Sequence, residues 1–283
     1  MNDININQLE NILGRKQYSK ITNLKTNFLE DKRVLITGAN GSIGNRIVDK
    51  FKDNNKINLL ATDISGEYEY LDITDNKNVK KIVTKFNPDF LINLAGAKHA
   101  PEGEFDTWTT FSINTLGTQY LLESIGNNTK FLLASTCKSA NPEIVYGASK
   151  LIAERMVLNE KGSVARFFNV VETSGNVFEI WKNVPDSEAI DLAPTCERHF
   201  ISLEEAVGLI IFCLDNEYGR YIVNSGPLIR MSDVADRLFP DRQKNIIAPR
   251  RGDRLSEKFL ATSESIETYF LDTEVIKVKN IHD

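Results

Sequence analysis

A glycine-rich turn between a short apolar run and an amphipathic stretch constrains the fold of this chain more than any other feature. The apolar run 34–36 is typical of a buried parallel strand, and residues 42–51 follow it with a helical pattern. Glycines between such elements permit a tight turn and let the backbone approach a pyrophosphate, which the free N–H groups of the helix N-terminus bind. The turn therefore predicts a dinucleotide site built by six residues, Gly38, Asn40, Gly41, Ser42, Ile43 and Gly44.

The second predicted strand, 57–61, is followed by an acidic residue that bears on the choice of cofactor. Asp63 comes 19 residues after Gly44. A carboxylate at this place accepts hydrogen bonds from ribose hydroxyls and repels a 2′-phosphate, so the sequence favours NAD over NADP. The alternative is an ordinary strand–turn–helix unit with Asp63 on the surface.

Strands and helices alternate along most of the chain. Further strands are predicted at 90–94, 131–134 and 164–168, and helices at 5–13, 76–86, 107–125 and from Asn141-Pro142 onward. This rhythm predicts an α/β fold with a Rossmann-like, doubly wound parallel sheet. After residue 170 the alternation of strands and helices becomes irregular, and helices are predicted at 202–215, with Ser202 as N-cap, and at 231–238. We expect an N-terminal helix and connector in 1–30, the dinucleotide-binding domain in 31–170, and mainly a small substrate-binding lobe and a tail in 171–283.

Residues at the next two strand ends are candidates for contact with the cofactor, because ligands of such sheets bind outside the carboxyl ends of the strands. For Asp72 a cap on the helix 76–86 is the alternative to a contact with adenine. Asn114 is unfavourable inside a helix and is expected to hold backbone or water near Lys150, or else to be exposed. The remaining candidates are Ile73 and the small residues Ala95, Gly96 and Ala97, which leave room for a flat ring.

The segment after the strand 131–134 carries the candidate catalytic residues. Tyr146 and Lys150 are spaced i and i+4, so a helix places them on one face, where an ammonium lowers the pKa of a phenol toward neutrality. A hydroxyl from Ser135 or Thr136 can orient the alcohol or carbonyl that reacts. This set can move a proton on an oxygen while a hydride moves on its carbon. An ordinary amphipathic helix is the alternative.

Bulk properties exclude several classes of function. The net charge of −5 over 283 residues argues against a general nucleic-acid surface, and no run approaches the ~18 apolar residues of a membrane span. The first residues lack the basic and apolar regions of a secretory signal, so we expect a cytoplasmic protein. No metal site is expected, because the cysteines and histidines are scattered, at Cys137, Cys196, Cys213, His99, His199 and His282.

Together these residues resemble the extended short-chain dehydrogenase/reductase superfamily, and more narrowly the nucleotide-sugar 4,6-dehydratases of bacterial polysaccharide biosynthesis. The similarity runs from Leu13 to about Leu260. Its order and spacing make it specific, and its pieces are Leu-Gly-Arg15, Gly41-Ser-Ile-Gly44, Lys98-His99-Ala-Pro101, Asn114-Thr-Leu-Gly117-Thr, Ser135-Thr-Cys-Lys138, Asn141-Pro142, Tyr146-Gly-Ala-Ser-Lys150, Arg166-Phe-Phe-Asn169-Val and Arg250-Arg-Gly252-Asp-Arg-Leu255.

The resemblance implies a mechanism and an assembly. Tyr146 takes the proton of the sugar 4-hydroxyl while NAD takes the C4 hydride, and the new ketone acidifies C5–H. Lys138 is the base that removes that proton, an acid helps the C6 hydroxyl to leave, and the hydride returns to C6. The product is a 4-keto-6-deoxy sugar. The family also implies a homodimer through the helices at about 107–125 and 144–160.

Residues of the substrate site come from the same resemblance. Asn169 and Arg198 resemble positions near the diphosphate and the sugar, and Arg250 and Asp253 resemble an Arg and a Glu that hold the nucleotide's phosphate and ribose. Lys98 and His99 are expected to line the sugar pocket, with a solvated pair as the alternative. The expected substrate is a nucleotide-diphosphate sugar, and a UDP-sugar is favoured.

Two departures from the family keep other activities open. Where the family has an Asp as acid, this chain has Cys137, a thiol that can donate a proton or can be a small inert residue. Only eight residues separate Asp63 from Asp72, so the helix usual there is missing, as in nucleotide-4-keto-sugar reductases. The alternatives are therefore a C4 epimerase, a 4-keto-sugar reductase, or a non-catalytic nucleotide-binding protein.

Overall fold

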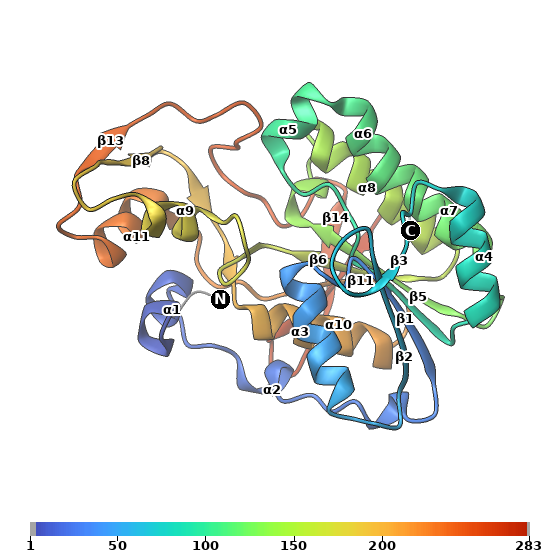
Figure 1. Cartoon of the computed structure of the whole chain (residues 1–283). Helices are drawn as coiled ribbons and strands as arrows, with labels where there is room; N and C mark the ends of the chain where they lie inside the picture. The colour runs from blue at the N-terminus through green and yellow to red at the C-terminus, as the bar shows by residue number, and fades with distance from the viewer. Residues whose placement is uncertain (1–3, 282–283) are drawn as a thin grey trace.

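The computed structural model describes residues 4–281, and His282 lies outside them. A nine-stranded sheet has the order β14-β15-β11-β6-β5-β4-β1-β2-β3 (Figure 1). The strands from β3 to β11 are parallel, and β15 and β14 add an antiparallel edge. The predicted doubly wound sheet is confirmed. Its order reverses between β1 and β4, which is where ligands of such sheets bind.

The elements of the sheet layer follow the predicted rhythm closely. The sheet strands are β1 (Arg33–Thr37), β2 (Asn58–Asp63), β3 (Glu69–Tyr70), β4 (Phe90–Asn93), β5 (Lys130–Thr136), β6 (Ser163–Phe167), β11 (Arg220–Val223), β14 (Glu264–Phe270) and β15 (Val275–Asn280). The helices beside them are α2 (Ser19–Thr22), α3 (Ser42–Lys52), α4 (Asn76–Phe86), α5 (Ala100–Phe105), α6 (Thr107–Phe111), α7 (Gly117–Ser124), α8 (Val145–Asn159) and α10 (Leu203–Asp215).

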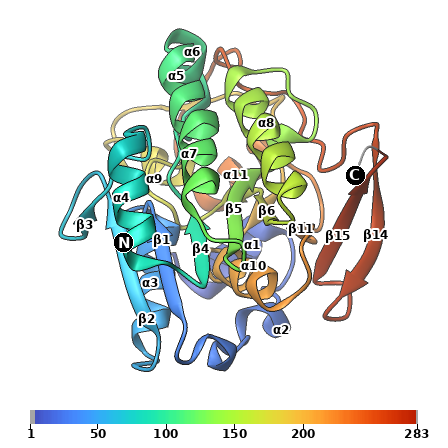
Figure 2. The same ribbon diagram turned by 90° about the vertical axis from the view of Figure 1, so that its right-hand side faces the viewer.

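Helices cover both faces of the sheet, which explains why its central strands are continuous apolar runs. Figure 2 shows α4, α7 and α8 on one face and α3 and α10 on the other. Helix α10 begins where predicted, because Ser202 and Glu205 form a reciprocal capping box. No helix lies between β2 and β3, so the short connection expected after Asp63 is also confirmed.

Two predicted helices differ from the structure. Helix α8 begins at Val145 rather than at Asn141-Pro142, because residues 140–144, which follow the 3₁₀ turn η3 (Cys137–Ser139), form bends and irregular backbone. The helix predicted at 107–125 contains one π-helical turn, η2 (Ser112–Leu116), centred on Asn114. A π turn inside a helix often marks a functional site.

A second core forms the lobe. It joins α1 (Ile6–Leu13) and α9 (Val177–Asn183) to α11 (Met231–Leu238) through side chains such as Leu9, Trp181 and Val234. Short strands complete it, namely β7 (Asn169–Val170), β8 (Ile190–Leu192), β9 (Glu197–Arg198), β10 (Phe200–Ile201), β12 (Ile229–Arg230) and β13 (Lys244–Ile246). The range 171–283 is therefore shared, since α10, β11, β14 and β15 belong to the main sheet layer.

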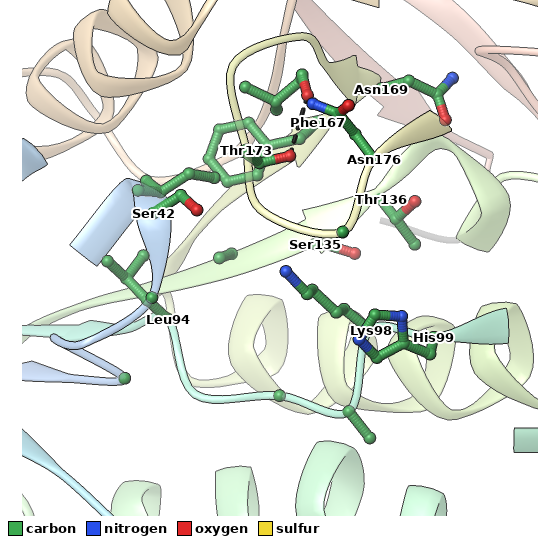
Figure 3. Close-up of a pocket in the computed structure, with 18 of the residues that line it drawn as sticks. Ser42, Leu94, Lys98, His99, Ser135, Thr136, Phe167, Asn169, Thr173 and Asn176 are labelled. Atoms are coloured by element: carbon green, nitrogen blue, oxygen red, sulfur yellow. Dashed lines mark hydrogen bonds between the residues drawn. The ribbon is translucent and has the colours of Figure 1, made fainter. Parts of the chain in front are cut away.

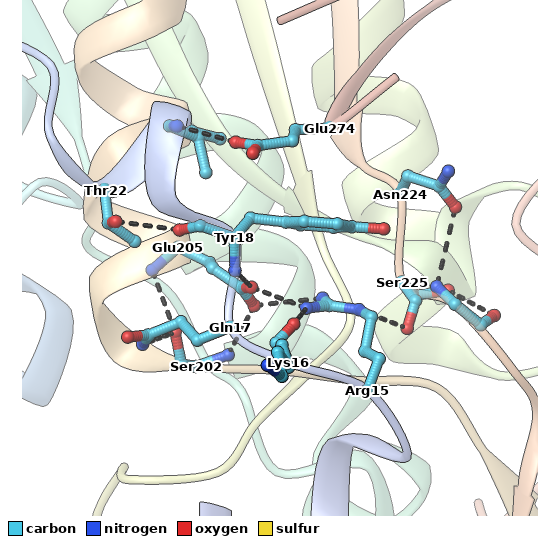
Figure 4. Close-up of polar contacts among 12 residues, drawn as sticks. Arg15, Lys16, Gln17, Tyr18, Thr22, Ser202, Glu205, Asn224, Ser225 and Glu274 are labelled. Carbon is cyan, nitrogen blue, oxygen red and sulfur yellow. Dashed lines mark hydrogen bonds and ion pairs between the residues drawn. The ribbon is translucent and has the colours of Figure 1, made fainter. Parts of the chain in front are cut away.

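The connector after α1 is more ordered than its polar sequence suggests. It contains α2 and the 3₁₀ turn η1 (Asn27–Leu29). Arg15 donates to Glu205 at 2.7 Å and to the Ser225 carbonyl at 3.2 Å, and its guanidinium lies 3.9 Å from the Tyr18 ring centroid (Figure 4). These contacts fasten the connector to the N-terminus of α10, between the lobe and the sheet.

Candidate active site

The glycine-rich turn wraps closely around the end of β1. Gly38 has a φ of +71°, and a Cβ there would lie 2.5 Å from the backbone nitrogen of Ala95. A Cβ on Gly44 would lie 2.3 Å from the Gly38 carbonyl oxygen. Both positions therefore require glycine. The turn lines a cavity of about 330 Å³, here called the cofactor cleft, with Gly38, Gly41, Ser42, Ile43 and Gly44.

Asp63 stands beside the turn at the end of β2. Its carboxylate accepts the backbone N–H of Asn40 at 2.9 Å and both the N–H and the hydroxyl of Ser65 at 3.0 Å. Asn40 in turn donates its side-chain amide to Ser65 at 3.1 Å. Asn40 and Asp63 thus shape the turn from outside the cleft, which their side chains do not line.

The candidates at the next strand ends separate into two groups. Gly96 and Ala97 line the cofactor cleft, whereas Ala95 packs against the core beneath it. Asp72 accepts the N–H and the hydroxyl of Thr74 at 2.8 and 2.7 Å, and Asp75 caps α4. The side chain of Ile73 is buried in the core against α7 and does not line the cleft.

Asn114 and Lys150 both lie next to Gly96 in the wall of the cleft. Asn114 is buried and clamps Ala97 from both sides, accepting its N–H at 2.9 Å and donating to its carbonyl at 3.1 Å. A Cβ on Gly96 would lie 3.0 Å from Lys150 Nζ, which shows how closely this ammonium approaches the backbone. Burial lowers the pKa of Lys150 to about 8, against the opposing charge of Glu154.

Four of the candidate catalytic residues line the cofactor cleft, namely Thr136, Lys138, Tyr146 and Lys150. Their electrostatics differ from the prediction, because burial raises the pKa of Tyr146 and the cation that opposes this effect is Lys138. A hydrogen bond with Thr136 also favours the phenolate and so lowers the pKa of Tyr146. Lys150 instead donates to the Ala134 carbonyl at 3.1 Å. Lys138, rather than Lys150, is thus the cation that lowers the pKa of the Tyr146 phenol.

Cys137 points away from the site. Its side chain is 1% exposed, packs in the main core and lines neither cavity. Burial raises the pKa of the Cys137 thiol to about 11, with a further contribution from Glu257, so the sulfur is protonated at neutral pH. This placement agrees with the inert alternative and gives the thiol no path to a ligand.

A second and larger cavity adjoins the cleft on the lobe side. It has a volume of about 890 Å³ and is here called the substrate cavity. Lobe residues such as Trp181 and Met231 form its apolar wall. It brings together every predicted substrate residue, namely Lys98, His99, Asn169, Arg198, Arg250 and Asp253.

The two cavities are continuous. Lys98, His99, Lys138 and Asn169 line both of them. In Figure 3, Ser42 and Leu94 lie at one end of the cofactor cleft and His99 and Asn169 at the other. The Ser174 backbone bridges the cleft, because its N–H donates to Ser42 at 3.0 Å and its carbonyl accepts Lys98 at 3.0 Å.

Sequence reasoning missed one residue of this junction. Glu257 is buried behind the cavity wall, and its carboxylate accepts Lys138 Nζ at 2.9 Å and the Asn169 amide at 2.7 Å. Arg198 Nε lies 3.7 Å from the same carboxylate. The one signal in the sequence is a carboxylate four residues after Asp253, within the segment that resembles the family.

Among residues 4–281 no group of three or more His, Cys, Asp or Glu side chains is placed to hold a metal ion. No helix in the same range is both long enough and apolar enough to cross a bilayer.

Comparisons with known proteins show the family of this chain and the proteins to which it is similar. A family model described as polysaccharide biosynthesis protein matches residues 34–279. UDP-N-acetylglucosamine 4,6-dehydratase (inverting) of Campylobacter jejuni is 28% identical over 269 residues, 84% of this chain and 80% of that enzyme. Capsular polysaccharide biosynthesis protein CapD of Staphylococcus aureus is 29% identical over 93% of this chain, which spans about half (51%) of CapD.

Solved structures share the fold. A UDP-glucose 4-epimerase of Thermus thermophilus, in complex with NAD, superposes with a TM-score of 0.71 at 20% identity, covering 81% of this chain and 90% of that one. Other structures of this fold hold NADP, and other relatives in sequence are epimerases and a reductase of nucleotide sugars.

Proposed function

The chain belongs to the polysaccharide biosynthesis protein family, and from this premise we propose that it is an NAD-dependent 4,6-dehydratase of a nucleotide-diphosphate sugar. The observation that carries the proposal is the continuity of the cofactor cleft with the substrate cavity. Tyr146 lines the cleft, Lys138 lines both spaces, and Arg198 and Arg250 line the cavity beyond. A sugar held by its diphosphate can thus present a ring hydroxyl to Tyr146.

The residues of the cleft fit a dinucleotide. The glycine turn leaves no room for a Cβ at positions 38 and 44, and it opens helix α3, whose N-terminus favours a pyrophosphate. Asp63 stands at the end of β2 beside the turn, and a carboxylate at this position can receive ribose hydroxyls and disfavours the 2′-phosphate of NADP. We therefore propose NAD. When bound, NAD supplies the acceptor for the C4 hydride and returns this hydride to C6.

The substrate cavity fits a nucleotide diphosphate. Arg250 pairs with Asp253 at 3.1 Å, and Arg198 lies 3.8 Å from the same carboxylate. Guanidiniums bind phosphates bidentately, so Arg198 and Arg250 can hold a diphosphate in this cavity. Because the C. jejuni relative is named for UDP-N-acetylglucosamine, we propose a UDP-sugar as the substrate.

Tyr146 performs the first proton transfer. Its phenolate takes the proton of the 4-hydroxyl, and the Thr136 hydroxyl, which bonds to Tyr146, orients the reacting oxygen. The charge of Lys138 favours the phenolate at this moment. The ketone that results makes the C5 proton acidic.

Lys138 then exchanges protons at C5 and C6. Its ammonium gives a proton to the departing oxygen as the C6–O bond breaks, and the resulting amine takes the C5 proton while the C5–C6 double bond forms. One water leaves and Lys138 is an ammonium again. After the hydride reaches C6, Lys138 reprotonates C5 and is left as an amine. The proton that Tyr146 removed from the 4-hydroxyl then passes from the phenol to this amine, so both residues regain their starting charge.

Incubation with candidate substrates tests this proposal. Purified protein with NAD should release water from UDP-N-acetylglucosamine or UDP-glucose, or from the dTDP or GDP counterparts, without net consumption of NAD. The variant Tyr146→Phe should lower turnover by ~10² or more, because it removes the general base, while the binding of NAD persists. If no sugar loses water in the presence of NAD, the dehydratase assignment fails.

One observation favours a second candidate, C4 epimerisation. Cys137 lies outside both cavities and Lys138 is paired with Glu257, so the acid and the free base of the family mechanism are both absent. Epimerisation needs only the hydride step and Tyr146.

A product of unchanged mass with an inverted C4 identifies an epimerase, and a stoichiometric loss of NADH with a 4-keto sugar identifies a reductase. A non-catalytic protein would bind the nucleotide sugar and leave it intact.

A further inference from the structure

Glu257 is the buried partner of the lysine at the junction of the two cavities. Its side chain is fully buried, at 0% exposure, whereas the side chain of Lys138 keeps 17% exposure and lines both cavities. The carboxylate therefore stands behind the ammonium, on the side away from the ligand space. It lines neither cavity and cannot itself reach a sugar.

Hydrogen bonds fix the carboxylate in this orientation. One oxygen receives Lys138 Nζ at 2.9 Å. The other receives the Asn169 amide at 2.7 Å and the backbone N–H of His199 at 3.2 Å. Because the second oxygen is held by donors on β7 and by His199 just before β10, the first is left to face Lys138. The arrangement sets both the place and the charge of the lysine.

We propose that Glu257 is a positioning residue that holds Lys138 as an ammonium at the junction of the cofactor cleft and the substrate cavity. The inference deepens the proposed function and rests on it for its catalytic meaning. The pairing with Glu257 keeps Lys138 protonated, so Lys138 can donate a proton at the start of the cycle. A general base would need the free amine instead. The pairing also explains how the chain works without a carboxylic acid at position 137.

The electrostatics of the pair agree with this geometry. Burial by itself lowers the pKa of Lys138, but the charge and hydrogen bond of Glu257, together with Cys137 and Tyr146, outweigh burial and raise it above the ordinary value. Burial raises the pKa of Glu257, and the charges of Lys138 and Arg198 with the hydrogen bonds to this carboxylate outweigh that effect, so the pKa is lowered. Among the groups that oppose burial at Lys138 the charge of Glu257 contributes most, so its removal must lower the pKa of Lys138.

Competitive labelling of lysines by acetic anhydride measures this fall without any substrate. Only the neutral amine reacts, so the midpoint of labelling against pH reports the pKa of each lysine, read by peptide mass spectrometry. In Glu257→Gln, labelling of Lys138 at pH 9 should rise by about tenfold or more, because one pKa unit multiplies the neutral fraction about tenfold. Lys98, which lines the same two cavities, is the matched control and should not change.

The variant is chosen to preserve structure. A glutamine oxygen still accepts the bonds from Asn169 and from the His199 backbone. The charge is lost on the side that faces Lys138 and, at 3.7 Å, Arg198 Nε. The wild-type protein supplies a second measurement, in which the labelling midpoint of Lys138 should lie above the ordinary lysine pKa of about 10.4. An unchanged Lys138 midpoint in folded Glu257→Gln, or a wild-type Lys138 midpoint below that ordinary value, overturns the proposal.

Kinetics separate positioning from a structural role. Turnover should fall on the alkaline side of its pH profile, and the midpoint of this fall should lie at lower pH in Glu257→Gln than in wild type. In Glu257→Asp the midpoint should return toward the wild-type value. In a Lys138→Met background, Glu257→Gln should change turnover less than twofold, since its effect passes through Lys138. A tenfold further loss in that background contradicts the inference. If no nucleotide sugar is turned over, the proposed function fails while the labelling result still decides the role of Glu257.

Discussion

At the scale of single residues, Cys137 shows that neighbours in sequence can face different environments, one the ligand cavity and the other the hydrophobic core. Thr136 and Lys138 line the cofactor cleft, whereas Cys137 between them is buried in the main core. The strand β5 ends at Thr136 and a 3₁₀ turn begins at Cys137, so the side-chain alternation of the strand does not continue. A thiol in this place contributes packing, not proton transfer.

Replacement of the thiol tests this assignment. Cys137→Ala should keep turnover within about threefold of wild type, whereas loss of a proton donor costs ~10²–10⁴. The matched control is Cys213→Ala, a second buried cysteine of the same core, and both variants should lose a similar, small amount of thermal stability. Loss of ~10² or more in turnover for Cys137→Ala alone contradicts the burial argument.

At the scale of elements, a buried ion network joins the helix that carries Tyr146 to the far edge of the sheet. Glu154 of α8 accepts Arg166 of β6 at 2.8 Å and Arg220 of β11 at 3.0 Å. Arg166 also binds Glu264, the first residue of β14, at 2.7 Å. Ser135 of β5 donates its hydroxyl to Glu154 as well. The network holds α8, and with it Tyr146 and Lys150, in register with β5.

Neutralisation of Glu154 should destabilise the whole sheet. Glu154→Gln leaves two buried guanidiniums undercompensated, which costs about 3–5 kcal/mol in free energy of unfolding at pH 7. Burial opposes the ionised form, but Arg166 and Arg220 lower the pKa of Glu154 to about 2. The stabilisation is therefore complete above the unfolded pKa of about 4.3 and is lost as the pH falls toward 2.

Urea unfolding of wild type and Glu154→Gln between pH 2 and 7 checks this expectation. The difference in unfolding free energy should be constant above about pH 5 and should shrink below about pH 4. Glu267→Gln, a change at an exposed pair with Lys277, is the control and should cost less than about 1 kcal/mol. Equal costs for the two variants would show that the network does not stabilise the sheet.

The limits of prediction from sequence also become clear at this scale. The elements from β1 to β6 could be predicted because their buried strands are apolar runs, and most site residues could be predicted because they follow strand ends. Glu257 could not, since its contact with Lys138 joins positions 119 residues apart in an irregular segment. The burial of Ile73 and Cys137 depends on helix packing, which a local pattern does not contain.

At the scale of the whole molecule, the lobe is assembled from helix α1 and from elements that lie more than 150 residues further along the chain, such as α9 and α11. Helix α1 packs in the lobe core, and the connector after it is fastened by Arg15 to Glu205 and Ser225 (Figure 4). The substrate cavity lies between this lobe and the sheet, so its shape depends on the N-terminal segment although no residue of that segment lines it.

An exposed apolar face suggests how two copies of the molecule meet, and we propose a homodimer through it. Phe105 of α5, Trp108 of α6 and Ile152 of α8 are exposed, Trp108 at 69%. Large apolar side chains that cluster on a surface mark interaction sites.

Light scattering should show a dimer for wild type and a monomer for Trp108→Glu. Ile246→Glu, an equally exposed residue of β13 in the lobe, should remain dimeric, and a monomeric wild type at micromolar concentration contradicts the proposal.

The path of one hydrogen atom tests the central claim, that Tyr146 and Lys138 convert a sugar through a 4-ketone at the junction of the two cavities. The measurement is mass and NMR analysis of the product from UDP-N-acetylglucosamine that carries deuterium at C4, incubated with the protein and NAD. We predict a product that has lost water and carries the deuterium at C6, formed by wild type and not by Tyr146→Phe. Recovery of the substrate with deuterium still at C4, unchanged in mass and configuration, would contradict the account.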